Sequence, residues 1–310
     1  MLGIVIKSTG SWYKLKLEDG SGLDARAKGK IRLQDIKTTN PIAVGDTVEY
    51  ELESGGDVVY GVIKSIQKRN NYIIRKSNKL SKQGQIIAAN LDLALLVVTL
   101  SSPKTSLGFI DRFLVMAGAY HISVTLVFNK VDTYTPAETL YYNNLKELYE
   151  SLGYPTVLTS IYDKAYEPLK QLEGIIQGKR VLISGHSGVG KSSLLNAMLP
   201  AASQRVNTVS VMHQKGKHTT TFAEMFYLNE HTAIIDTPGI RDFGIIDISE
   251  TEIGHYFPEI RFFMKQCKFN DCKHLNEPEC AVIKAYETGE IAASRYYNYL
   301  SILENKDIFD

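Results

Sequence analysis

The chain has 310 residues, of which 44% are hydrophobic, and it carries a formal net charge of +1. This length predicts two or three domains with packed cores. No apolar run reaches the ~18 residues of a membrane-spanning helix, and the N-terminal stretch "MLGIVIKSTGSW" lacks the pattern of a signal peptide. Three cysteines exclude a disulfide framework and fit a reducing compartment. We therefore expect a cytoplasmic protein with no membrane partner.

Residues 1 to about 66 contain short alternating stretches separated by turn signals such as "EDGSG" and "ESGGD". The five stretches are "GIVIKS", "SWYKLKLE", "DARAKGKIRL", "DTVEYELES" and "DVVYGVIKSI". Alternation places successive side chains on opposite faces of a strand, which is typical of a small antiparallel barrel. Five strands in so short a segment favour an OB-fold, a fold that binds RNA or single strands. An SH3-like or other small barrel with a structural role is the alternative.

Residues 58–91 form a basic segment that contains Tyr72 and has no Asp or Glu. Lys and Arg that meet phosphates release condensed counterions, so the segment predicts a footprint for rRNA. A solvated linker is the alternative. The basic residues of the segment are Lys64, Lys68, Arg69, Arg75, Lys76, Lys79 and Lys82.

From about Ile86 onward, apolar runs alternate with helical stretches, which indicates a parallel sheet covered on both faces. The part from about Ser249 is helix-like and contains a cysteine cluster. We therefore expect a multidomain protein with an N-terminal β-barrel at 1–68, a central α/β domain at 69–245 and a mostly helical domain at 246–310. The apolar runs are Leu93–Leu100, Val124–Lys130, Tyr154–Ser160, Arg180–Gly185 and Thr232–Gly239.

The stretch "GHSGVGKSS" fits the phosphate-loop pattern G-x-x-x-x-G-K-[ST], between the strand "RVLIS" and the helix "SSLLNAML". Its glycines let backbone N–H groups turn toward phosphates. Lys191 supplies charge to the β- and γ-phosphates, and Ser192 offers its hydroxyl to Mg²⁺. The expected phosphate-binding residues are Gly185, His186, Ser187, Gly188, Val189, Gly190, Lys191, Ser192 and Ser193.

The stretch "DTPG" follows the strand "TAII". Asp236 at a strand end is placed to hold Mg²⁺ through water, and Gly239 to present its N–H to a γ-phosphate. The preceding polar stretch, 200–221, ends in "KGKHTTT", and a loop of this length is usually functional. We expect Thr220 to close on Mg²⁺ and the γ-phosphate, with the neighbouring threonines as alternatives. The loop is expected to order with the triphosphate and to loosen after hydrolysis.

The stretch "NKVD" follows the apolar run "VTLVF". Asp132 can accept hydrogen bonds from N1–H and the 2-amino group of guanine, whereas adenine would leave this carboxylate unpaired. Asn129 is expected to bond the base and brace the phosphate loop, and Lys130 to lie over the ring. Ser160 in "LTS" is the predicted second base-contacting position, although Ile161 replaces the Ala often found next to it.

The base motif therefore precedes the phosphate loop, which reverses the usual order of such domains. Both orders can build one sheet, because domain termini often lie close together and circular permutation is tolerated at surface sites. The sequence thus predicts a circularly permuted P-loop GTPase domain that binds GTP and GDP with Mg²⁺.

All three cysteines and one histidine lie within a short segment with the spacing C-x₄-C-x-H-x₅-C. Three thiolates and an imidazole form a closed tetrahedral set that suits one structural Zn²⁺. The metal would stabilise the fold of a region that is too short to bury a sufficient core of its own. Buried inert thiols are the alternative. The expected ligands are Cys267, Cys272, His274 and Cys280.

With its permuted motif order, "GKHTTT", "DTPGIRDFG" and the cysteine cluster, the sequence resembles the RsgA (YjeQ) family of circularly permuted GTPases along almost its whole length. The resemblance implies an OB-fold, a permuted GTPase domain and a C-terminal zinc domain. It also implies GTP hydrolysis stimulated by the small ribosomal subunit, with rRNA contacts from the flanking domains. The zinc ligands of the family match the same four positions.

Many GTPases place a Gln directly after the "DxxG" turn to orient water, but Ile240 occupies that position here. We expect slow intrinsic hydrolysis. His218 is the candidate for orienting water, since the resemblance implies a His in this motif; a role in shaping the loop is the alternative. The predicted function is a monomeric GTPase that couples hydrolysis to late maturation of the small subunit and to its own release. A nucleotide-sensing RNA-binding scaffold is the alternative, and a metal-delivery GTPase is weaker because the Cys₃His set looks closed.

Overall fold

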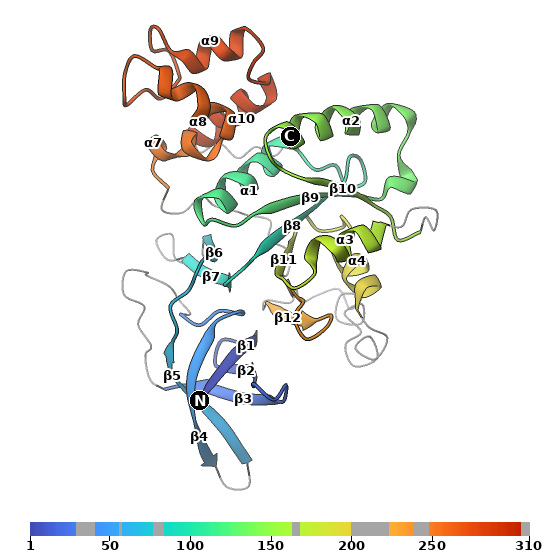
Figure 1. Cartoon of the computed structure of the whole chain (residues 1–310), viewed down its shortest axis with the longest axis vertical. Coiled ribbons are helices and arrows are strands. Elements are labelled where there is room, and N and C mark those ends of the chain that lie inside the picture. The colour runs from blue at the N-terminus through green and yellow to red at the C-terminus, as the bar shows by residue number, and fades with distance from the viewer. Residues whose placement is uncertain are drawn as a thin grey trace.

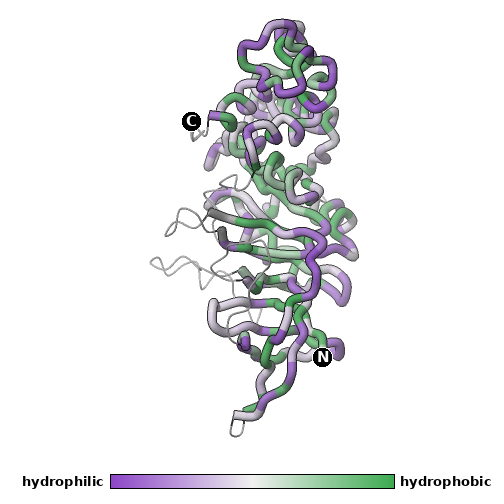
Figure 2. Tube along the Cα trace, turned by 90° about the vertical axis from the view of Figure 1, so that its left-hand side faces the viewer, coloured by the Kyte–Doolittle hydropathy of each residue, from purple (hydrophilic) through white to green (hydrophobic). Residues whose placement is uncertain are grey.

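The computed structural model describes residues 1–28, 41–55, 58–76, 84–162, 168–199, 223–237 and 248–304. Three parts follow one another along the long axis: a barrel, a central sheet with helices on both faces, and a small helical domain (Figure 1). The tube is mostly hydrophobic where the central strands run (Figure 2). No helix within the described ranges is long and apolar enough to cross a membrane.

The N-terminal barrel closes because its first and fourth strands pair, giving the strand order β1-β2-β3-β5-β4-β1. Alternate residues such as Val5, Leu15 and Ile63 point inward and form its core. The predicted five-stranded barrel is confirmed, but it is not antiparallel throughout, because β3 and β5 pair in parallel. Its strands are β1 (Leu2–Ser8), β2 (Trp12–Lys16), β3 (Gly22–Ala27), β4 (Thr47–Gly55) and β5 (Val58–Ile66).

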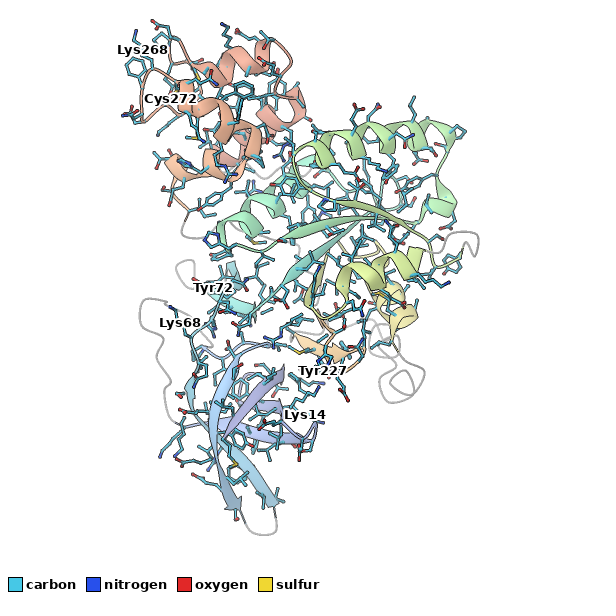
Figure 3. All side chains as sticks on the ribbon, viewed as in Figure 1. Lys14, Lys68, Tyr72, Tyr227, Lys268 and Cys272 are labelled. Atoms are coloured by element: carbon cyan, nitrogen blue, oxygen red, sulfur yellow. The ribbon has the colours of Figure 1, made fainter. Side chains whose placement is uncertain are left out.

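The basic segment 58–91 begins as the barrel strand β5 and continues as a folded connector that includes a hairpin of β6 (Tyr72–Lys76) and β7 (Gly84–Ala89). Arg69 forms a buried ion pair with Asp46 at 2.6 Å, and their side chains are 8% and 0% exposed. Tyr72 packs against Tyr120, with ring centroids 5.0 Å apart. The buried pair removes Arg69 from the predicted RNA footprint, whereas Lys68 and Tyr72 lie beside the junction of barrel and central sheet (Figure 3). Lys79 and Lys82 lie outside the described residues.

The central sheet has the order β10-β9-β8-β11-β13-β12, in which β12 alone runs antiparallel to its neighbour. Beyond β12, the sheet continues into the barrel, because Lys7 of β1 pairs with Glu224. The strands are β8 (Leu93–Val98), β9 (Val124–Asn129), β10 (Thr156–Thr159), β11 (Arg180–Ser184), β12 (Glu224–Tyr227) and β13 (Ala233–Asp236).

Two pairs of helices cover the two faces of this sheet. Leu96 faces α1 and α2, whereas its neighbour Leu95 faces α3 and α4, as expected for strands buried on both faces. Ser106 caps α1, and Thr135 with Glu138 forms a capping box at the start of α2. The helices are α1 (Leu107–Ala119), α2 (Pro136–Ser151), α3 (Pro168–Ile176) and α4 (Lys191–Met198), with a short turn η1 (Val131–Thr133).

The C-terminal domain is helical, as predicted, and lies against α1 (Figure 1). Its small core surrounds Phe257, Ile260 and Tyr299, and Val115 of α1 joins it. The elements are α7 (Glu250–Ile253), η2 (Gly254–Tyr256), α8 (Pro258–Phe263), η3 (Met264–Gln266), α9 (Ala281–Glu287) and α10 (Ala293–Leu303).

Candidate nucleotide-binding site and metal centre

The predicted base and phosphate motifs meet at one edge of the central sheet. Strands β9, β8, β11 and β13 are parallel neighbours, so their carboxyl ends lie together. The register pairs Thr159 with Asn129 and Ile183 with Asp236. Only β8 separates β9 from β11, a span of about 10 Å between strand axes. Segments far apart in the sequence therefore approach one another at a single edge.

The phosphate loop needs its glycines for steric reasons. Gly185, Gly188 and Gly190 have φ values of 140°, 85° and 100°. A Cβ on Gly185 would lie 2.2 Å from the carbonyl oxygen of Val97, and one on Gly190 would lie 2.3 Å from Asn129 Nδ2. The loop leads into α4, so the positive end of the helix faces the space over the loop.

Lys191 lies across this loop. Its ammonium group donates to the carbonyl oxygens of Gly185 and His186, each at 2.7 Å. Burial lowers the pKa of Lys191, and the charge of Asp236 at the end of β13 opposes that shift. An anion held by the loop would stabilise the charged lysine further, which is the behaviour expected of a phosphate-binding residue.

Asn129 connects the phosphate loop to the end of the neighbouring strand. Its Nδ2 donates to Val189 O at 2.8 Å, and its Oδ1 accepts from Thr159 Oγ1 at 2.9 Å. The side chain is 3% exposed, so both bonds form away from solvent. This residue fixes the distance between β9, β10 and the phosphate loop.

The carboxylate of Asp132 points to the second predicted base-contacting position. Ser160 Oγ donates to Asp132 Oδ1 at 2.5 Å and accepts from the backbone N–H of Tyr162 at 3.1 Å. Lys130 has φ 65°, and its ammonium donates to Ser102 O at 2.5 Å. The structure thus gathers Asn129, Asp132 and Ser160 at the same edge as the phosphate loop.

Several predicted site residues lie outside the described part of the chain. These are His218, Thr220, Gly239 and Ile240, and their roles stay predictions. Ser192 is the second residue of α4, directly after the phosphate loop that follows β11, and Asp236 ends β13, the strand next to β11. A hydroxyl and a carboxylate placed at neighbouring strand ends are oxygen ligands of the kind that Mg²⁺ prefers.

Three thiols and one imidazole converge in the C-terminal domain, within 4.8 Å of one another. Cys267 Sγ lies 3.8 Å and Cys272 Sγ 3.6 Å from Cys280 Sγ, and His274 Nδ1 lies 3.3 Å from the same sulfur. A tetrahedral ion with Zn–S bonds of about 2.3 Å separates its sulfur ligands by about 3.8 Å. The cluster therefore fits zinc in both ligand type and spacing.

The segment that carries these ligands is fixed by α10. Tyr296 OH donates to the carbonyl oxygen of His274, and Tyr299 OH donates to that of Lys273, both at 2.8 Å. Burial lowers the pKa of His274, which favours the neutral imidazole that a metal requires. Burial also raises the pKa of Cys272 to about 12, so a metal must displace the thiol proton.

Sequence reasoning missed two groups of residues. Ser102 and Pro103 border the site: Ser102 accepts from Lys130, and Pro103 Cδ would lie 3.4 Å from a Cβ on Gly188. Arg295 of α10 and Asp111 of α1 form a buried ion pair. A lone Asp in the apolar stretch "GFIDRFLVMAGAY" is a usable signal for a buried partner, but no pattern in the sequence identifies Arg295.

Comparison with known proteins places this geometry in a family. A family model described as RsgA GTPase matches residues 66–246, and one described as RsgA N-terminal domain matches residues 2–60. The chain is 50% identical to the small ribosomal subunit biogenesis GTPase RsgA of Christiangramia forsetii, over 99% of this chain and 97% of that protein. It is 49% identical to RsgA 2 of Bacteroides thetaiotaomicron, over the same shares of both chains.

Two solved structures share the fold over nearly the whole chain. YjeQ from Thermotoga maritima superposes with a TM-score of 0.74 at 36% identity, covering 98% of this chain and 97% of that one. YloQ, described as a circularly permuted GTPase, superposes with a TM-score of 0.72 at 29% identity, covering 98% and 94%. In this chain too, the base motif on β9 precedes the phosphate loop after β11. The chain belongs to the RsgA GTPase family and is a GTP hydrolase.

Proposed function

We propose that this protein hydrolyses GTP on the small ribosomal subunit, that the subunit stimulates hydrolysis, and that hydrolysis times late maturation and release. The observation that carries the proposal is the Asn129 bridge, which joins the phosphate loop to the strand ends bearing Asp132 and Ser160. The printed names of the relatives supply the ribosomal partner. The cytoplasm, where subunits are assembled, is the proposed location, and a monomer the proposed state.

Guanine recognition is assigned to the Asp132 carboxylate. Ser160 already occupies one of its oxygens and orients it, so the carboxylate faces a base with a fixed geometry. Asn129 braces the loop, Lys130 covers the base, and Lys191 compensates phosphate charge. Residues Gly185–Ser193 supply the backbone donors for the phosphates.

Hydrolysis is assigned to groups at the γ-phosphate. Ser192, Thr220 and Asp236 would hold Mg²⁺, which neutralises charge on the phosphates when bound. His218 is the candidate for orienting the attacking water, and Gly239 for donating to the γ-phosphate. Because Ile240 has no polar group, intrinsic turnover is expected to be slow until the subunit completes or reshapes the site.

Both flanking domains present surfaces suited to rRNA. On the barrel, the exposed side chains of Trp12 and Arg26 contact the half-buried Tyr60. Tyr60 lies edge-on to Trp12 at 6.0 Å, and the Arg26 guanidinium lies 4.7 Å from the Tyr60 ring. Exposed aromatic rings and Arg side chains are the usual stacking partners of bases. In the C-terminal domain, Lys265 and Lys284 are exposed. We also propose the domain division 1–68, 69–245 and 246–310, with zinc in the last domain.

The proposal is tested by measuring the GTPase rate of the full chain with and without purified small subunits at a stated salt concentration. We expect a large rise in kcat with subunits, and co-sedimentation that is stronger with a non-hydrolysable GTP analogue than with GDP. Nucleotide-dependent sedimentation without stimulation would instead favour the RNA-binding scaffold. The matched variant is His218→Ala, whose stimulated kcat is expected to fall while its GTP affinity is retained.

Base specificity is tested separately with Asp132→Asn. The amide keeps the shape of the carboxylate but cannot accept two hydrogen bonds from guanine, so GTP affinity is expected to fall about 10- to 100-fold. Xanthosine triphosphate, with a carbonyl in place of the 2-amino group, is expected to recover binding to the variant. Equal GTP affinity of the variant and the wild type would remove Asp132 from the base site.

A further inference from the structure

A buried polar network joins the C-terminal domain to the two helices on one face of the central sheet. Arg295 of α10 donates to Asp111 of α1 through Nη1 at 2.6 Å, and to Glu259 of α8 through Nε at 2.6 Å and Nη2 at 3.2 Å. Asn298 and Tyr149 also donate to Asp111, at 2.5 and 2.9 Å. One carboxylate on α1 thereby receives donors from α10 and α2.

The three charged residues of the network are buried away from water. The side chains of Arg295 and Asp111 are 1% and 0% exposed, and that of Glu259 is 7% exposed. Burial alone would lower the pKa of Arg295, but attraction by Asp111 and Glu259 outweighs it and raises the pKa. Removing one partner would leave a buried charge uncompensated, so the pairing strongly prefers one geometry of α10 on α1.

The N-terminal end of α1 reaches the nucleotide site. The ring of Phe109, two residues before Asp111, lies 3.7 Å from the ring of His186 in the phosphate loop. The preceding loop contacts the same site through Pro103 beside Gly188 and Ser102 O beneath Lys130. Helix α1 therefore supports the phosphate loop at one end and holds the C-terminal domain near its middle.

Hydrogen bonds across the loop before α1 tie the end of β8 to the residues next to the helix. Thr99 accepts from the backbone N–H of Thr105 at 2.9 Å, its own N–H donates to Thr105 Oγ1 at 3.2 Å, and its hydroxyl donates to Pro103 O. A cavity of about 290 Å³ lies between this loop, α2 and α10. The polar network thus lies beside this cavity, because Asn298, which donates to Asp111, is one of the residues that line it.

The two faces of α10 serve different contacts. Arg295 and Asn298 face α1, whereas Tyr296 and Tyr299, each one residue further along, bind the segment that carries His274. Tyr299 of α10 therefore offers a control for Tyr149 of α2, because each donates one hydroxyl hydrogen bond but only Tyr149 donates to Asp111.

We propose that the Asp111–Arg295 network is a coupling contact, and that Arg295 is a positioning residue that acts on the nucleotide site through α1. When the network holds the C-terminal domain against α1, this helix supports the phosphate loop in the conformation that binds a triphosphate. When that contact is weakened, the support weakens too, and the difference between the affinities for GTP and GDP becomes smaller. By thermodynamic reciprocity, the bound nucleotide changes the equilibrium between the attached and the loosened C-terminal domain by the same factor.

The test uses the full chain without ribosomes and compares Tyr149→Phe with Tyr299→Phe. Both remove one tyrosine hydroxyl bond of 2.8–2.9 Å, but only Tyr149 donates to Asp111. Affinities for GDP and for a non-hydrolysable GTP analogue, intrinsic kcat and KM, and hydrogen exchange of residues 99–110 are measured for each. Asn298→Ala, which removes the third donor to Asp111, serves as a second network variant.

We expect Tyr149→Phe and Asn298→Ala to reduce the GTP-analogue to GDP affinity ratio about 3- to 30-fold, mainly through weaker binding of the analogue. Exchange of residues 99–110 should rise, while Tyr299→Phe leaves the ratio and this exchange unchanged. Folded network variants with an unchanged ratio would overturn the proposal and leave the network a structural contact only.

The proposal rests on the nucleotide pocket proposed above, and different results would refute the pocket and the coupling. A wild-type chain that binds no GTP would refute the pocket. A wild type that binds GTP, together with network variants that keep its nucleotide ratio, would refute the coupling alone. Absence of subunit stimulation bears on the ribosomal role and leaves this measurement intact.

Discussion

The two flanking domains are attached to the central sheet by different kinds of contact. The barrel is joined largely through main-chain groups, in addition to the buried Arg69–Asp46 ion pair. Lys7 pairs with Glu224 in the ladder between β1 and β12, and Arg180 and Asn90 side chains donate to Gly45 O at 2.8 and 3.0 Å. Lys16 adds a cation–π contact, with its ammonium nitrogen 3.3 Å from the centroid of the Tyr227 ring; Figure 3 labels Tyr227. The C-terminal domain is joined instead by buried charged side chains.

This difference predicts where each attachment is vulnerable. Main-chain pairing survives most side-chain changes, but it fails where a Cβ enters a close backbone approach. A buried ion network depends on each member, since removing one partner leaves the others unpaired. The barrel has a core of its own, whereas the core of the C-terminal domain includes Val115 of α1 and Cys280 of the Cys₃His cluster.

The largest effect is expected from removing the metal. Chelation, or Cys272→Ser, should unfold the C-terminal domain while the barrel stays folded, because structural zinc contributes folding free energy directly. Circular dichroism and limited proteolysis would measure this loss. Since the metal displaces a thiol proton with a pKa of about 12, lower pH favours the thiol and weakens metal binding. A C-terminal domain that keeps its helices after complete metal removal would contradict the expectation.

A smaller but still large loss of stability is expected from Arg295→Met. The substitution leaves Asp111 and Glu259 buried without their cation, at a cost of about 3–5 kcal/mol in the free energy of unfolding. Arg26→Met is the control, because Arg26 and Glu53 pair at 3.2 Å with half-exposed side chains and should contribute little. Chemical unfolding measures the free energy of unfolding of both variants. Equal losses would contradict the expectation that a buried ion pair is more costly to break than an exposed one.

The main-chain attachment of the barrel is tested with Gly45→Ala. Gly45 has φ 95°, and a Cβ there would lie 2.1 Å from Ala89 O, at the junction with β7. Gly20→Ala is the matched control, since Gly20 has φ 83° but nothing within 4 Å of its would-be Cβ. The control should lower the free energy of unfolding by about 1–2 kcal/mol, from backbone conformation alone. Gly45→Ala should lower it by more. An equal loss in both variants would mean that the junction moves apart to accept the Cβ without strain.

The smallest effect is expected from Lys7→Ala. Lys7 and Glu224 form a salt bridge of 2.9 Å between the barrel and the sheet, but both side chains are about one-third exposed. Such a pair contributes about 0.2–1 kcal/mol, and the backbone ladder remains without it. A double-mutant cycle with Glu224→Ala measures the coupling. A coupling above that range would show that side chains, too, hold the barrel in place.

Local sequence patterns determined much of the architecture and of the nucleotide site. Alternation identified the barrel strands, and apolar runs identified the buried parallel strands, because burial on both faces removes polar residues from a strand. The motifs containing Lys191, Asp132 and Cys272 could be proposed as phosphate, guanine and zinc sites, because each of these ligands restricts residue type and spacing over a few neighbouring positions.

The tertiary structure alone decided which distant residues meet. Thr159 is an ordinary strand residue in the sequence, yet it fixes the Asn129 amide. Arg69 reads as part of a basic surface but is buried against Asp46. Arg295 lies 184 positions from Asp111, and no local pattern links them. The physical reason is that hydrogen bonds and ion pairs across domains depend on how packed helices and strands are juxtaposed, and that juxtaposition leaves no periodic trace in the chain.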